Sequence, residues 1–188
     1  MLTDDRLDML ARVARAPHGT LEGGSSDPSI LLIAAASYGS RPNDETTVPT
    51  GFDPQAAMLF ESIVEGAYLV ATADGVFDED EKRVFERVVM AACGGSVPQK
   101  LVSDLVADLA DLLEEDGLEQ RVTRLGDALK RREHASEVLR IAALIAQVSD
   151  DVSSNERSML ERLATAFKLD KGEVDQALDD VKKSLRAD

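Results

Sequence analysis

Ala-Asp-Gly-Val-Phe-Asp-Glu-Asp-Glu-Lys occupies residues 73–82, and a related stretch, Ser-Asp-Asp-Val-Ser-Ser-Asn-Glu-Arg, occupies residues 149–157. Each stretch follows an apolar segment with helical spacing and leads into a capped helix, and the second copy is one residue shorter. Two such units in one chain usually pack so that each buries the apolar face of the other. The sequence therefore predicts an all-α bundle of two helix, acidic loop, helix repeats related by a pseudo-two-fold axis.

Capping signals set the expected helix boundaries. Asp53 followed by Pro54 begins a helix that reaches about residue 73. Two capping boxes are expected, Asp78 with Glu81 and Ser153 with Glu156. Other helices are expected over residues 4–16, 28–38, 97–116, 118–132, 135–148 and 170–185. Asp27 is expected to cap the helix at 28–38, Ser96 with Gln99 the helix at 97–116, and Asp170 with Glu173 the helix at 170–185.

Composition favours a helical bundle and excludes several partners. Hydrophobic residues make up 44% of the chain but aromatic residues only 4%, which suits a core of Ala, Leu and Val. The net charge of −15 repels nucleic acid and anionic lipid surfaces. Metal ions and basic protein surfaces remain as partners.

Residues 40–53 contain two prolines, one glycine and several polar residues, which is typical of a linker. We therefore expect residues 1–52 to form an N-terminal helical appendage and linker, and residues 53–188 to form the main helical domain.

The chain is expected to be cytoplasmic. Its single cysteine, Cys93, lies in an apolar helical stretch and is expected to be a buried structural thiol in a reducing compartment. The first residues lack the pattern of a secretory signal, and the longest apolar run, residues 30–36, is far too short to span a bilayer. No direct membrane insertion is expected.

The acidic loops are candidate metal sites. Asp74 and Asp150 each follow the C-terminal end of an apolar helix, where the helix dipole disfavours negative charge and a bound cation would offset that effect. The predicted ligands are Asp74, Asp78, Glu81, Asp150, Asp151 and Glu156. Two simpler explanations stay open: helix capping accounts for Asp78, Glu81 and Glu156, and an Asp-Gly turn accounts for Asp74.

Oxygen ligands without a cluster of Cys and His indicate a hard divalent cation. Ca²⁺ is favoured, because it tolerates irregular loops, and Mg²⁺ or Mn²⁺ would also fit. The loop is not an EF-hand, because Val76 occupies a position where that motif requires an oxygen ligand.

The paired motifs resemble the Ser-Asp-Gly and downstream Glu-Lys signatures of the TerB tellurite resistance family, over about residues 55–186. The resemblance implies a helical TerB fold, an acidic surface that binds divalent cations, and a role in tellurite resistance and stress response. It also implies a membrane partner resembling TerC, which would place the protein at the periphery of the inner membrane. In the second loop Asp151 replaces the family's glycine, so this residue either adopts a left-handed conformation or forces a different turn.

The sequence also bears on two other function classes. In the first, a metal-free adaptor would bind a basic protein segment through an acidic helix face formed by Asp104, Asp108, Asp111 and Glu115. We expect no basic residue of that helix to neutralise this face, and Arg121, Arg124 and residues 130–132 could lie against it. The second class, an enzyme, is not expected, because the sequence has no nucleophile motif, phosphate loop or Glu-x-x-His pattern, and His18 and His134 suit solvated or capping roles.

Overall fold

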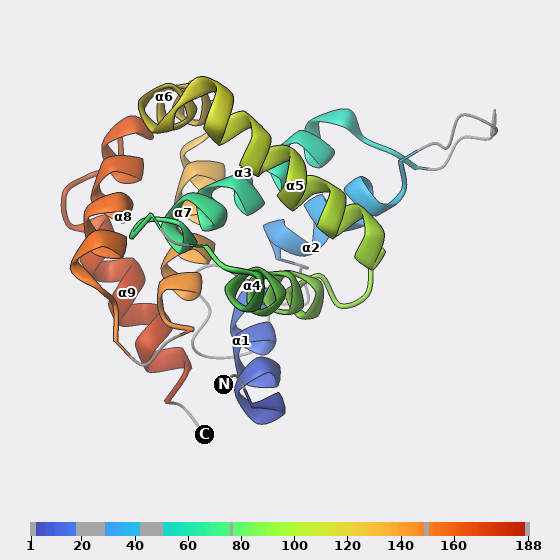
Figure 1. Cartoon of the computed structure of the whole chain (residues 1–188). Coiled ribbons are helices and arrows are strands. Elements are labelled where there is room, and N and C mark those ends of the chain that lie inside the picture. The colour runs from blue at the N-terminus through green and yellow to red at the C-terminus, as the bar shows by residue number, and fades with distance from the viewer. Residues whose placement is uncertain (1–2, 18–28, 42–50, 76, 149–150, 187–188) are drawn as a thin grey trace.

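The computed structural model describes residues 3–17, 29–41, 51–75, 77–148 and 151–186, and these residues form α-helices and no strand (Figure 1). The helices are α1 (Asp4–Arg15), α2 (Ile30–Gly39), α3 (Pro54–Ala71), α4 (Glu79–Ala92), α5 (Gln99–Asp116), α6 (Leu118–Ala128), α7 (Arg132–Ala146), α8 (Ser154–Ala166) and α9 (Glu173–Ser184). The all-α prediction is confirmed.

The two apolar helices of the predicted repeats, α3 and α7, pack against each other at the centre. Most of their side chains are buried, because apolar residues cover nearly the whole circumference of both helices. A Cβ on Gly66 would lie 2.5 Å from Cγ1 of Val138, so glycine permits this close crossing. The pseudo-two-fold relation between the repeats stays a prediction.

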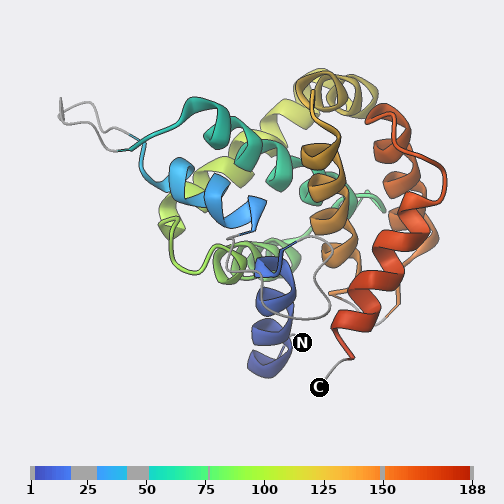
Figure 2. The same ribbon diagram turned by 180° about the vertical axis from the view of Figure 1, so that it is seen from behind.

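The other helices surround this central pair. α2 packs on α3 and α9 packs on α7, as the view from behind shows (Figure 2). α8 contacts both α6 and α7. Leu10, Ala14, Leu31 and Tyr38, from the predicted appendage, belong to the same hydrophobic cluster as the side chains of α3 and α7. The domain division at residue 53 stays a prediction, and the core continues across it.

Local capping explains most helix starts. Asp53 accepts a hydrogen bond from the Gln55 amide at 2.9 Å, and both predicted capping boxes are present. Two caps differ from the prediction. Ser29, rather than Asp27, caps α2, because its hydroxyl accepts from the Leu32 amide at 3.2 Å; Asp27 lies outside the described residues. Ser96 does not cap α5, which begins after Pro98 without a side-chain cap.

The last helix also begins differently from the prediction. Gly172, rather than Asp170, occupies the N-cap position of α9, and no side chain caps this helix. Glu173 still accepts a hydrogen bond from the Asp170 amide at 3.2 Å, so half of the expected reciprocal pair forms.

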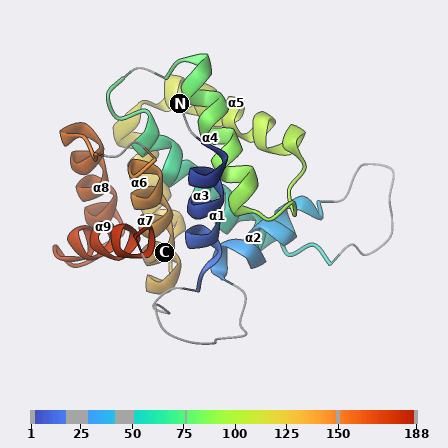
Figure 3. The ribbon, with the colours of Figure 1, turned by 90° about the horizontal axis from the view of Figure 1, so that it is seen from below.

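Helix α1 is held against the bundle by buried polar contacts. The guanidinium of Arg140, in α7, donates to the carbonyls of Val13 and Ala14 at 2.9 and 2.8 Å and to Glu137 at 2.8 and 2.9 Å. It thereby donates to backbone carbonyls in the last turn of α1, where a helix has no N–H groups of its own to pair with them. Figure 3 shows α1 lying between α4 and α7.

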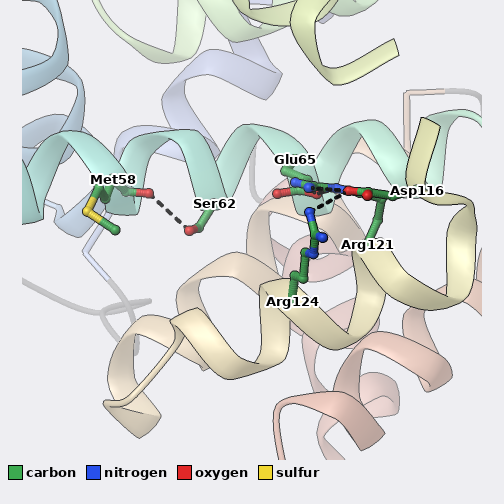
Figure 4. A network of polar contacts seen from close by, with 6 residues as sticks. All are labelled: Met58, Ser62, Glu65, Asp116, Arg121 and Arg124. Carbon is green, nitrogen blue, oxygen red and sulfur yellow. Dashed lines mark hydrogen bonds and ion pairs between the residues drawn. The ribbon is translucent and has the colours of Figure 1, made fainter. Parts of the chain in front are cut away.

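A second polar network joins α3 to the α5–α6 junction (Figure 4). Arg121 donates to Glu65 at 2.8 Å and to Asp116 at 3.0 Å, and Arg124 donates to Asp116 at 2.8 Å. Desolvation by burial raises the pKa of Glu65, opposed by its bond to Arg121. The sequence suggested that Arg121 and Arg124 lie against the acidic face of α5. They do not, because the turn at Gly117 directs them to Asp116 and Glu65 instead.

Candidate functional site

The start of α4, the end of α7 and the start of α8 enclose a cleft of about 750 Å³. Its floor is apolar, and its rim carries charged side chains. The floor comprises Ala71, Phe77, Val84, Phe85, Ile145 and Val148, and the rim comprises Asp78, Asp80, Glu81, Arg83, Arg87 and Glu156. The two acidic loops of the sequence therefore lead into one shared cleft.

Aromatic rings gather beneath this cleft. The ring of Phe77 lies 5.3 Å from that of Tyr68 and 6.0 Å from that of Phe85, both edge to face. The chain has only seven Phe and Tyr residues and no Trp, so three of the seven lie together here. Edge-to-face pairs of this kind add about 0.5–1.5 kcal/mol each to simple burial and so stabilise the packing at the floor of the cleft.

The acidic rim is shaped by the two capping boxes. Asp78 Oδ1 accepts from the amides of Asp80 and Glu81, both at 2.9 Å, while Glu81 Oε2 accepts from the Asp78 amide at 3.0 Å. Glu156 Oε2 likewise accepts from the Ser153 amide at 2.7 Å. Glu81 and Glu156 hold the same position in the two repeats, and each uses one carboxylate oxygen for the cap.

Both arginines at the rim are neutralised within the chain. Arg83 pairs with Asp80 at 2.8 Å, and Arg87 pairs with Asp4 of α1 at 2.9 Å. Within the described ranges, Asp78, Glu81 and Glu156 form no ion pair with the chain. The charge that the cleft presents to a ligand is therefore negative.

A family model described as tellurite resistance protein TerB matches residues 67–179, which is more than half of the chain and includes every residue lining the cleft. The chain belongs to the TerB family. Comparison with curated proteins and with solved structures gives no match. Helices α1 and α2 and the first part of α3 precede the TerB match.

Within this TerB chain, the predicted metal ligands divide into two groups. Asp78, Glu81 and Glu156 line the cleft, whereas Asp74 and Asp151 are exposed and do not line it. Asp150 lies outside the described residues. Across the parts of the chain that the structure describes, no three or more His, Cys, Asp or Glu side chains are close enough to hold a metal ion. The six-residue metal site stays a prediction.

A positively charged side chain from α1 lies at the C-terminal end of α7, and sequence reasoning missed it. Arg6, from α1, donates to the carbonyl of Gln147 at 2.8 Å. Positive charge is favourable at a helix C-terminus, so this guanidinium takes part of the role expected of a bound ion near Asp150. No local signal could have shown this, because 141 residues separate the two partners.

Sequence reasoning also missed the apolar floor. Ile145 and Val148 continue the apolar pattern of α7, and such residues are expected in a core. Phe77 gave one usable signal in the sequence, because it is a large apolar residue inside an acidic loop. In the structure its side chain is only partly buried.

The acidic face of α5 is exposed, as the adaptor hypothesis requires. Asp104, Asp108, Asp111 and Glu115 all lie at the surface. One expectation was wrong: Lys100, on the same helix, pairs with Asp104 at 2.5 Å, because residues four apart share a helix face.

Cys93 and His134, the described Cys and His residues, lie away from the cleft. Burial raises the pKa of the Cys93 thiol to about 12, and burial with the nearby charge of Arg131 lowers the pKa of His134. Neither residue lines the cleft, and His18 lies outside the described residues. None of the helices in the described ranges has the length and apolar character needed to cross a membrane.

Proposed function

We propose that this TerB-family chain is a non-enzymatic, divalent-cation-binding interaction module in tellurite resistance and stress response. One observation carries the proposal: Glu81 and Glu156, equivalent residues of the two repeats, line the same cleft. Because neither forms an ion pair among the described residues, a cation would neutralise charge that the chain leaves uncompensated.

The donor chemistry fits a hard cation. The caps engage one oxygen each of Asp78, Glu81 and Glu156, so the second oxygens can contribute to binding. Ca²⁺ is favoured over Mg²⁺ and Mn²⁺, because it accepts irregular oxygen sets completed by water. Asp74, Asp150 and Asp151 are proposed as further ligands from the two loops.

Cation occupancy would link the start of α4 to the start of α8. A ligand that binds one arrangement of these helices more tightly shifts the population toward it. We propose that this shift controls a protein partner, with a membrane protein resembling TerC as the candidate, and that the chain acts in the cytoplasm at the inner membrane through that partner.

Calorimetric titration with Ca²⁺, Mg²⁺ and Mn²⁺ tests cation binding. Glu81→Gln with Glu156→Gln should weaken binding about tenfold or more, while glutamine still accepts the capping hydrogen bond. Asp111→Asn, on the exposed face of α5, is the matched control and should leave binding unchanged. Absence of binding up to about millimolar concentration, the weak end for protein calcium sites, would contradict the proposal.

A metal-free acidic adaptor is the second candidate. Asp108, Asp111 and Glu115 are exposed on α5 and form no ion pair with the described residues. A basic peptide that binds this face should lose affinity in Asp108→Asn with Asp111→Asn and at high salt, and should be insensitive to chelator. A change in binding on chelation, in either direction, would favour the cation-responsive module instead.

A further inference from the structure

The cleft has an apolar floor that cation binding does not require. A hard cation is coordinated by oxygen atoms and water and gains nothing from nearby aliphatic or aromatic side chains. Yet Ile145 and Val148 of the α7 end, Val84 of α4 and the ring of Phe77 all face the same cleft as the carboxylates. The combination of an apolar floor and a charged rim indicates a second kind of ligand.

We propose that this cleft binds an amphipathic helical segment of a protein partner. Its bulky aliphatic side chains would lie on the floor, and its Lys or Arg side chains would pair with Asp78, Glu81 and Glu156. An amphipathic helix in an apolar groove is a common mode of peptide recognition. The inference shares these carboxylates with the proposed cation site but does not depend on cation binding.

Charge complementarity selects a basic segment. Arg83 and Arg87 are neutralised by Asp80 and Asp4, so the carboxylates of Asp78, Glu81 and Glu156 dominate the rim. The net charge of −15 reinforces this local field over a longer range and would steer a basic segment toward the protein. An acidic segment would be repelled on both counts.

The polar groups favour a protein segment over a small polar molecule. Specific small-molecule sites place a few polar groups inside the pocket to fix the ligand. The side chains that form the floor of this cleft are all apolar, so among the lining residues of the described ranges none below the rim can fix a small polar ligand. The charges of Asp78 and Glu81 are exposed at the rim, which suits the border of a helix lying across the floor.

Because a cation and a basic segment would draw on the same carboxylates, the two ligands should compete. Neutralising Glu81 and Glu156 with a cation removes the attraction for Lys and Arg while leaving the floor unchanged. Cation concentration would in this way set the affinity for the partner.

Fluorescence anisotropy in EDTA tests the segment without any cation. The probe is a labelled helical peptide of about 15 residues, with Leu at i, i+3, i+4 and i+7 and Lys beside them. One control peptide has Ser in place of Leu, and another has Glu in place of Lys. Protein variants are Glu81→Gln with Glu156→Gln, Val148→Ser, and Asp111→Asn as the control outside the cleft, each checked for folding by urea unfolding.

The Leu/Lys peptide should bind at least about tenfold more tightly than either control peptide. The paired glutamine variant should weaken that binding about tenfold, and Val148→Ser should weaken it while leaving the Ser/Lys peptide unaffected. Equal binding of the Leu and Ser peptides, no binding of the Leu/Lys peptide, or full affinity in the glutamine variant would each overturn the inference. A negative titration with Ca²⁺, Mg²⁺ and Mn²⁺ would instead count only against the proposed cation site.

Discussion

Gly66 of α3 packs tightly against Val138 of α7. A Cβ at this position would lie 2.5 Å from Cγ1 of Val138, which is inside the distance that real side chains tolerate. Its neighbours Ile63, Leu69 and Val70 are almost fully buried, so the helices have little room to move apart.

Gly66→Ala should therefore lower the free energy of unfolding by about 1–3 kcal/mol, the usual cost of overpacking a core. Urea unfolding followed by circular dichroism measures this. Gly172→Ala is the matched control, because an added Cβ there meets nothing within 4 Å, and it should have little effect. A Gly66 variant as stable as the control would show that the crossing can relax.

Cys93 is buried, and burial raises the pKa of its thiol to about 12 from an ordinary value of 9.0. Below about pH 9 the thiol is protonated in both the folded and the unfolded protein, so its contribution to stability is fully present. That contribution is lost as the pH rises toward 12, because only the unfolded protein then loses the proton readily. Urea unfolding at pH 8 and pH 10 should show wild type losing more stability over this range than Cys93→Ala.

The thiol should also react slowly with a disulfide reagent at pH 8 until urea unfolds the protein. A thiol reacts as its thiolate, which burial suppresses here. Rapid labelling of the folded protein at pH 8 would contradict the buried, protonated state.

At the scale of elements, a buried polar contact attaches the last turn of α1 to α7. Arg140 joins the carbonyls of Val13 and Ala14 to Glu137, whose side chain is 1% exposed. Breaking a buried pair is costly, because the partner keeps a charge without compensation.

Arg140→Met should accordingly lower the free energy of unfolding by about 3–5 kcal/mol and speed hydrogen exchange in α1. Adding Glu137→Leu should restore much of that loss, since both charges are then gone. Arg83→Met, which removes an exposed pair with Asp80, should change stability by about 1 kcal/mol or less. Unchanged exchange in α1 would show that its apolar contacts suffice to hold it.

Helix starts were largely predictable because a cap is a local interaction. Asp78, Ser153 and their glutamates are three residues apart, so the reciprocal bonds form within one turn. The prediction failed for α5, where Ser96 lies two residues before the true N-cap, Pro98. Proline fixes its own backbone at the helix start, and that local preference was stronger than the cap of Ser96.

At the scale of the whole molecule, residues outside the TerB match contribute to one core. Leu10 and Ala14 of α1 and Leu31 of α2 are at most 2% exposed and lie in the cluster that includes α3 and α7. Each large apolar side chain that is fully buried contributes about 1.5–3 kcal/mol.

A fragment of residues 53–188 should therefore be less stable than the full chain by several such contributions and should self-associate through its uncovered apolar face. Urea unfolding and size-exclusion chromatography measure the two effects, with a fragment of residues 29–188 as the intermediate case. A monomeric fragment 53–188 with the stability of the full chain would establish residues 1–52 as an energetically separate appendage.

The sequence by itself determined the helical class, most helix boundaries and the two capping boxes, because these depend on residues within one or two turns. It also determined the TerB resemblance, because both motifs are read directly from the order of residues. Only the tertiary structure decided that Glu81 and Glu156 line one cleft, that Ile145 and Val148 form its floor, and that α1 docks on Arg140. Those contacts join residues up to 127 positions apart, and no local pattern encodes which distant helix end a side chain will meet. They follow from how α3 and α7 cross, which is set by packing over the whole core.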